Sequence, residues 1–146
     1  MHILPIFLFW GGLVMALKHP STMLDDDGNQ LPDLVAAENE VHRLERLVEQ
    51  AISLIGYEFS EGESAGQMSD QQRANMNAEI KAGMESAVSV SAECIRWLKV
   101  KVLPALEDKR AVRYVEESLL GFKAMHAPML IDLKAFCRRH GLKVGV

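Results

Sequence analysis

An apolar pattern with helical spacing runs through residues 33–56 and constrains the fold more than any other feature of this chain. Its members recur at alternating intervals of three and four, namely Leu34, Ala37, Val41, Leu44, Val48, Ala51 and Ile55. This spacing places one apolar stripe along a single helix face, as in a coiled coil or helical bundle. Leu47 and Leu54 widen the stripe, which indicates more than one neighbouring helix. We expect a helix that begins with Asp33 as its N-cap and ends near Gly56.

The same stripe is our predicted partner interface. An apolar seam of this length has to be covered, either by a protein partner or by a second copy of the chain. The residues that we expect to make this contact are Leu34, Val41, Leu44, Val48 and Ile55. Charged residues at intervals of three and four occupy the other faces and predict a solvated surface rather than a site. They are Glu38, Glu40, Arg43, Glu45, Arg46 and Glu49.

Two further stretches of similar length, residues 70–103 and 105–140, repeat the helical pattern. Ser69 and Gln72 have the spacing of a capping box and predict the start of the first stretch. Its small residues would let another helix approach closely, and they are Gly83, Ala87 and Ser91. The spacing therefore predicts two more long helices.

Pro104, Pro128 and Gly141 mark the ends and a kink of these helices. Pro104 disfavours helical backbone at Leu103, so we expect the chain to reverse there. Pro128 lies inside an apolar register that continues on both sides of it. The sequence therefore predicts one long helix kinked at this proline, or two collinear helices. Gly141 follows basic residues and predicts a C-terminal cap.

The predicted fold is all-α, a three- to four-helix antiparallel bundle with an apolar segment before it. Its length suits one domain, and its 49% hydrophobic and 25% charged composition is that of a globular chain. The two long helices would form a hairpin with the first helix packed along it. Residues 57–68 contain two glycines and three acids and predict a mobile loop. We assign the bundle to residues 33–146.

Residues 1–17 (MHILPIFLFWGGLVMAL) have no charged side chain, and no later segment resembles them. As a helix, residues 3–17 would span only ~22 Å against a hydrocarbon core of ~30 Å, so an anchor made from them would be short. The residues that we expect to contact a membrane are Ile3, Phe7, Phe9, Trp10, Leu13 and Leu17. A turn-rich polar linker, residues 18–32, follows this segment.

Two other interpretations of residues 1–17 stay open. One is a signal peptide, since Val14 and Ala16 have the small-residue spacing of a cleavage site. The other is a segment buried against the helices or a partner, with a break at Gly11 and Gly12. We expect the membrane anchor in preference to both.

No catalytic or cofactor motif occurs in the sequence. Cys137 and His140 are residue types that bind metals, and their spacing places them on one helix face. They lack further ligands, because Cys94 is predicted to lie far from Cys137 along the bundle. His126 lies in an apolar stripe, where a partly buried and hydrogen-bonded histidine is expected rather than a haem ligand. Phosphate-binding glycine loops and Glu-x-x-His pairs are absent from the sequence. We therefore expect no enzyme activity, no cofactor and no metal.

Charge is divided unevenly along the chain. Residues 1–70 carry three basic and twelve acidic side chains, whereas residues 71–146 carry thirteen basic and eight acidic ones. Such a division is more typical of complementary helix faces than of a nucleic-acid surface, and the basic residues fall at both ends of the predicted hairpin. Nucleic acid is therefore not an expected partner.

Two function hypotheses follow from these patterns. The preferred one is a non-enzymatic, membrane-associated accessory or assembly subunit that binds protein partners, or a second copy, through its bundle. The alternative is a cytoplasmic helical module, regulatory or nucleic-acid-binding, whose N-terminal segment packs into its own core or against a partner.

Overall fold

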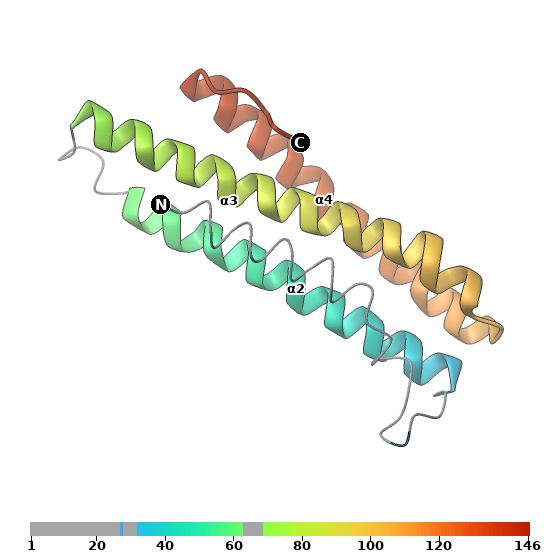
Figure 1. Cartoon of the computed structure of the whole chain (residues 1–146). Helices are drawn as coiled ribbons and strands as arrows, with labels where there is room; N and C mark the ends of the chain where they lie inside the picture. The colour runs from blue at the N-terminus through green and yellow to red at the C-terminus, as the bar shows by residue number, and fades with distance from the viewer. Residues whose placement is uncertain (1–26, 28–31, 63–68) are drawn as a thin grey trace.

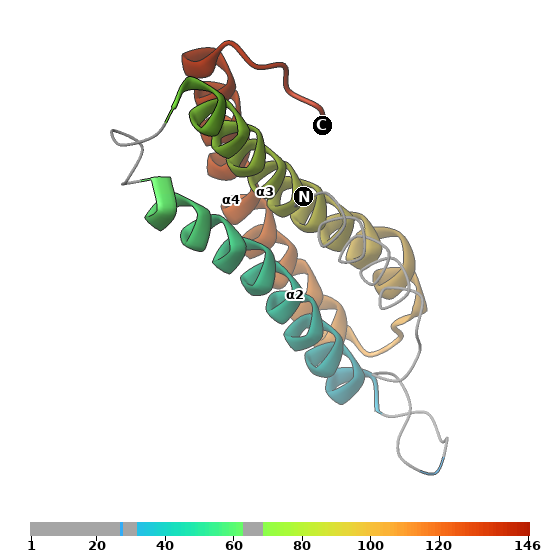
Figure 2. The ribbon, with the colours of Figure 1, turned by 60° about the vertical axis from the view of Figure 1, so that its left-hand side comes forward.

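The computed structural model contains three long helices that pack side by side (Figure 1). It describes residue 27, residues 32–62 and residues 69–146, and only the backbone at 56–62. The helices are α2 (Asp33–Gly62), α3 (Asp70–Trp97) and α4 (Lys109–His140), and each contacts the other two. The described residues contain no strand, which confirms the all-α prediction. Figure 2 shows α2 running along the side of the hairpin that α3 and α4 form.

Helix α2 extends beyond its predicted end. It continues to Gly62, so the prediction of a loop was wrong for residues 57–62. The physical reason is that one glycine in a helix interior, such as Gly56, costs only about 1 kcal/mol relative to alanine. A long helix tolerates that cost.

Asp33 lies at the start of α2 but does not act as its predicted N-cap. The Pro32 carbonyl accepts the first helical hydrogen bond, from the Ala36 N–H at 2.9 Å. The Asp33 carboxylate instead accepts hydrogen bonds from the backbone N–H groups of Glu107 at 2.6 Å and Asp108 at 2.8 Å. Asp33 thus ties the start of α2 to the turn between α3 and α4, a contact across more than seventy residues that local sequence rules do not detect.

Helix α3 begins at the predicted signal, but the prediction of non-helical backbone at Leu103 was wrong. Leu103 keeps right-handed helical backbone, because Pro104 lies in the first turn of a 3-10 helix, where no N–H donor is needed. The Ser69 hydroxyl accepts the Gln72 N–H, and the Ser69 N–H donates to the Gln72 side chain at 2.9 Å, which completes the capping box. At the other end a π-helical turn, η3 (Leu98–Val102), and a 3-10 turn, η4 (Leu103–Ala105), precede the reversal. Proline cannot donate the next helical hydrogen bond and its ring crowds the preceding turn, which accounts for the change of helix type before Pro104.

Helix α4 is continuous through Pro128. Ala124, whose carbonyl loses its helical donor to this proline, is exposed together with Pro128, so water can replace the missing donor. The helix ends at Gly141, which adopts a left-handed φ of 67° and donates its N–H to the Cys137 carbonyl. The predicted C-terminal cap is confirmed.

The core lies along the lines where the three helices meet. A larger part joins all of them around side chains such as Leu44, Leu98 and Val115. A smaller part joins α3 and α4 around Ile80, Leu133 and Phe136. Fully buried apolar side chains of this kind contribute about 1.5–3 kcal/mol each.

Within residues 32–62 and 69–146, no helix combines the length and the apolarity that crossing a membrane requires. The predicted apolar segment 1–17, with all of its membrane-contact residues, lies outside the described residues. So does the linker 18–32, apart from its residues 27 and 32.

Candidate protein-interaction site

The predicted partner seam of α2 lies in the core of the chain itself. Val41, Leu44 and Val48 are at most 1% exposed. Leu34 and Ile55 are partly buried against the same core. In the folded chain these side chains therefore face α3 and α4, and their contact with a separate protein stays a prediction.

Glu40 is buried, although its position among charged residues predicted a solvated surface. Its side chain is 1% exposed, and it forms an ion pair with Arg43, one helical turn away and 18% exposed. The Arg43 Nε–H donates to Glu40 Oε1 at 2.6 Å. The surface prediction was wrong for this residue because α2 buries a second stripe, beginning at Ala36, beside its apolar seam.

The thiol of Cys94, on α3, lies near this ion pair. The Cys94 thiol is buried and lies 4.0 Å from the Leu44 carbonyl oxygen. Glu40 Oε2 and the indole N–H of Trp97 are buried without a hydrogen-bond partner among the residues that the structure describes. We call Glu40, Arg43 and Cys94 the polar cluster. A buried group without a hydrogen-bond partner usually lowers the free energy of unfolding by about 1–3 kcal/mol, so such groups destabilise the fold.

The Cys94 thiol is unsuited to nucleophilic chemistry. Burial raises its pKa to about 12, the positive charge of Arg43 lowers it, and the carboxylates of Glu93 and Glu40 raise it. Since the thiolate is the nucleophile, a thiol with this pKa stays protonated and inert at neutral pH.

We predict that Cys94 resists thiol reagents in the native chain and reacts only on unfolding. The folded-state pKa lies above the unfolded value near 9, so the stability that the protonated thiol provides is complete below about pH 9 and is lost as the pH rises toward 12. Labelling with a chromogenic disulfide at pH 8, in a Cys137→Ala background with and without denaturant, measures this. Fast labelling without denaturant would contradict the predicted burial, and a Cys94→Ala/Cys137→Ala chain gives the blank.

His126 lies between α3 and α4 and has a structural partner. Its Nδ1 is 2.7 Å from the Ser91 hydroxyl oxygen, which itself donates to the Val88 carbonyl at 2.9 Å. Ser91 has one proton to give, so the hydrogen-bond network assigns the Nδ1–H of His126 as the donor. This agrees with the predicted partly buried, hydrogen-bonded histidine.

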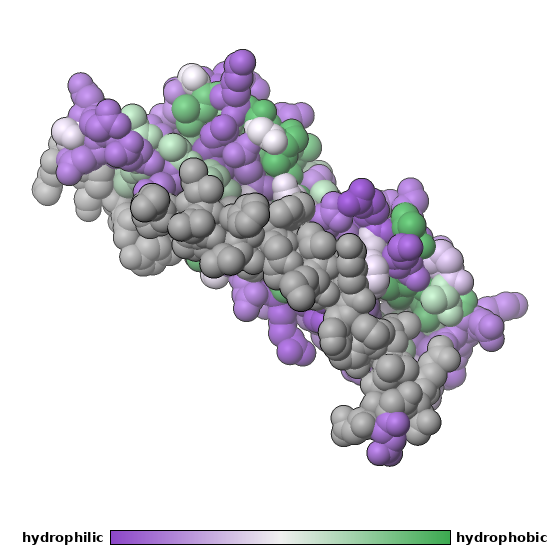
Figure 3. Space-filling view, in the orientation of Figure 1, coloured by the Kyte–Doolittle hydropathy of each residue, from purple (hydrophilic) through white to green (hydrophobic). Residues whose placement is uncertain are grey.

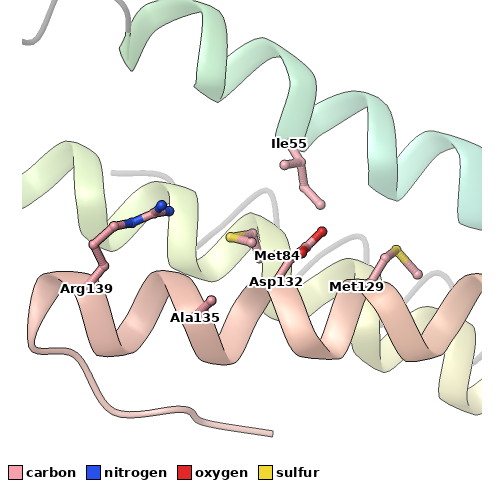
Figure 4. A pocket seen from close by; sticks show the side chains of 6 residues that line it. All are labelled: Ile55, Met84, Met129, Asp132, Ala135 and Arg139. Carbon is pink, nitrogen blue, oxygen red and sulfur yellow. The ribbon is translucent and has the colours of Figure 1, made fainter.

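A shallow pocket of about 270 Å³ lies where α2, α3 and α4 meet (Figure 4). Its lining residues are Ile55, Met84, Met129, Asp132, Ala135 and Arg139. It is smaller than the usual ligand site of 300–1,000 Å³. Figure 4 shows Asp132 and Arg139 apart from each other, with Ala135 between them. This arrangement does not bring an acid and a base together at a reacting atom.

Metal ligands do not gather in the described residues, where no group of three or more His, Cys, Asp or Glu side chains could hold an ion. Both cysteines are free and buried. His140 lies beside Phe136, with ring centroids 4.6 Å apart, and its Nδ1 is 3.3 Å from the Asn77 amide nitrogen.

The most exposed large apolar side chains of the described residues lie on the outside of α4. Leu120 is 67% exposed and Ile131 is 65% exposed. Ala124 and Ala127 lie between them at helical spacing and are exposed as well. We call these four residues the outer face of α4. Figure 3 shows scattered apolar residues (green) among hydrophilic ones (purple) on the side of the molecule that faces the viewer in Figure 1.

The sequence analysis did not predict the outer face of α4, because it considered only the apolar stripe that is buried. A signal was present, because residues 120, 124, 127 and 131 repeat the three- and four-residue spacing on the opposite side of the helix. Two apolar stripes on one helix indicate two contacts, and only one of them is made within the described chain.

Comparisons of the chain with family models, with curated proteins and with solved structures find no match. The function therefore has to be argued from the chemistry and geometry of this chain alone.

Proposed function

We propose that this protein is a non-enzymatic, membrane-associated accessory or assembly subunit that binds a protein partner through the outer face of α4. The observation that carries the proposal is the exposure of Leu120 and Ile131, which stand at 67% and 65% on an otherwise well-packed helix. Burying these two side chains against a partner would be favourable by about 25 cal/mol for each Å² of apolar surface removed from water.

Membrane association is supported by the sequence of residues 1–17, which contains no charge over its whole length. Removing such a segment from water is favourable whether it spans the bilayer or lies in its interface. We propose that it holds the antiparallel helical bundle at the membrane surface. The polar linker, residues 18–32, would separate the two parts.

A protein partner is favoured over nucleic acid by the distribution of basic residues. Lys99 and Lys101 lie at the end of the hairpin where the chain reverses, whereas Arg138 and Arg139 lie in the last turn of α4, at the opposite end. Phosphate binding requires several cations along one surface. Glu93 also pairs with the nearby Arg96 and reduces the positive potential there.

The proposal is tested by the size and location of the native complex. Membranes from cells that produce the full chain are solubilised in a mild detergent and separated by native electrophoresis. We expect the chain to sediment with membranes and to migrate as a complex, and we expect Leu120→Lys/Ile131→Lys to reduce it to a single chain.

Val100→Lys is the matched control, because Val100 is 54% exposed but lies outside α4. It should leave the complex intact. A chain that remains in the supernatant after lysis would contradict the membrane assignment, and equal mobility of wild type and Leu120→Lys/Ile131→Lys would contradict the interaction site.

A further inference from the structure

We propose that the partner of the outer face of α4 is a second copy of this chain, and that two α4 helices pack antiparallel in a symmetric homodimer. This inference rests on the proposed function and names its partner. It is argued from the positions and charges of exposed residues on α4.

The spacing of the outer face is symmetric about its own centre. The intervals from Leu120 to Ala124, Ala127 and Ile131 are four, three and four, and they read the same in both chain directions. In an antiparallel pair Leu120 of one copy therefore faces Ile131 of the other, and Ala124 faces Ala127. In a two-fold interface each such contact occurs twice, once in each direction. The two alanines at the centre allow the helix axes to approach closely, while the larger residues close the seam above and below.

Charges adjoining the seam select the antiparallel direction. Glu117 and Lys134 occupy the next positions of the same register on either side, and both are exposed. In the antiparallel arrangement Glu117 faces Lys134 of the second copy, and symmetry forms this pair twice. In a parallel arrangement Glu117 would face Glu117 and Lys134 would face Lys134. Opposite charges favour the first arrangement, and like charges disfavour the second.

Arg113 and Arg138 limit the length of the seam. They occupy the following layer of the register, are exposed, and would face each other across the antiparallel pair. Long arginine side chains can turn outward into water, so the contact ends there. The dimer interface is thus short and bounded by charge.

The two other occupants of this face lack matching charges. Residues 1–17 carry no charged side chain and offer nothing to Glu117 or Lys134. A lipid surface would have to accept Glu117 beside Leu120 at one end of the face, although a carboxylate gains nothing from anionic headgroups. A second copy supplies the complementary charge at both ends.

Charge reversal tests the homodimer. Sedimentation equilibrium of the full chain, in a density-matched detergent, should show a monomer–dimer equilibrium for the wild type. Glu117→Lys and Lys134→Glu should each weaken dimerisation about tenfold, because either change makes both symmetric pairs repulsive. The double variant, Glu117→Lys/Lys134→Glu, should regain the wild-type affinity. All these positions are exposed, so circular dichroism should show an unchanged fold.

Lys99→Glu is the control, since it changes the net charge as Lys134→Glu does but lies exposed on η3. It should leave the equilibrium unchanged. A wild-type chain that stays monomeric at hundreds of micromolar, or a double variant that remains as weak as the single ones, would overturn the homodimer. In that event a native complex that still depends on Leu120 and Ile131 would leave the proposed function standing with a different protein as partner.

Discussion

Replacement of Arg43 by leucine is expected to destabilise the fold by about 3 kcal/mol, because it leaves the Glu40 carboxylate buried without its ion-pair partner. Glu40 is 1% exposed and Arg43 is 18% exposed, so the carboxylate cannot reach water without moving the helix. Breaking a buried ion pair on one side usually costs about 3–5 kcal/mol. The lower end of that range applies because Arg43 itself retains some contact with solvent.

The reverse substitution should also destabilise the fold. Glu40→Leu leaves the buried Nη1 and Nη2 of Arg43 without their carboxylate, and we expect a loss of about 3 kcal/mol. Glu40→Leu/Arg43→Leu should lie within about 1 kcal/mol of the wild type, since well-packed apolar residues often replace buried ion pairs without loss. The unpartnered Glu40 Oε2 strengthens this expectation, because the double variant removes its desolvation cost.

Urea unfolding followed by circular dichroism measures all three variants and completes a double-mutant cycle. Arg46→Leu is the matched control on the same helix, one turn from Arg43 and exposed, and should change the free energy of unfolding by no more than about 0.5 kcal/mol. Equal effects of Arg43→Leu and Arg46→Leu would show that the Glu40–Arg43 pair is not buried in solution.

The second large effect is expected from Leu44→Ala, which should cost about 3 kcal/mol. Leu44 is 0% exposed and lies in the larger part of the core, where α2 meets α3 and α4. The loss combines the transfer free energy of the removed methyl groups with a cavity that three long helices cannot fill without shifting their axes. Leu44 also presents the carbonyl beside Cys94, so a shift of α2 would disturb the polar cluster.

Leu54→Ala provides the comparison with identical side-chain chemistry on the same helix. Leu54 is 43% exposed, and its truncation should change the free energy of unfolding by no more than about 0.5 kcal/mol. Both measurements use the same denaturant titration, in which the slope should stay constant if only the stability changes. If Leu44→Ala costs no more than Leu54→Ala, α2 does not pack on the hairpin as described.

Local patterns were sufficient wherever a structural feature depends on neighbouring residues. The capping box at Ser69, the reversal that follows Pro104 and the left-handed cap at Gly141 each arise from backbone chemistry within a few residues. Apolar spacing likewise identified which side of each helix lies in the core. The end of α2 was missed because a single glycine opposes a helix too weakly to end it.

Contacts between residues far apart in the sequence could not be predicted from local patterns. Asp33 resembles an N-cap locally, yet its carboxylate accepts N–H groups of the turn at Glu107 and Asp108. Glu40 resembles the solvated acids around it, and only the packing of a second α2 stripe buries it. Each outcome depends on which element lies opposite, and residue spacing along one helix carries no information about that.

The sequence therefore determined the spacing of the apolar stripe on α2, but it did not determine which helices cover that stripe. Periodicity required that residues 34–55 of α2 be covered, because apolar side chains at helical spacing gain free energy only out of water. Tertiary structure decided that α3 and α4 cover them, and that the most exposed large apolar side chains of the described residues belong to α4. Covering a stripe depends on the spatial arrangement of whole helices, and that arrangement is settled by the packing of the entire chain.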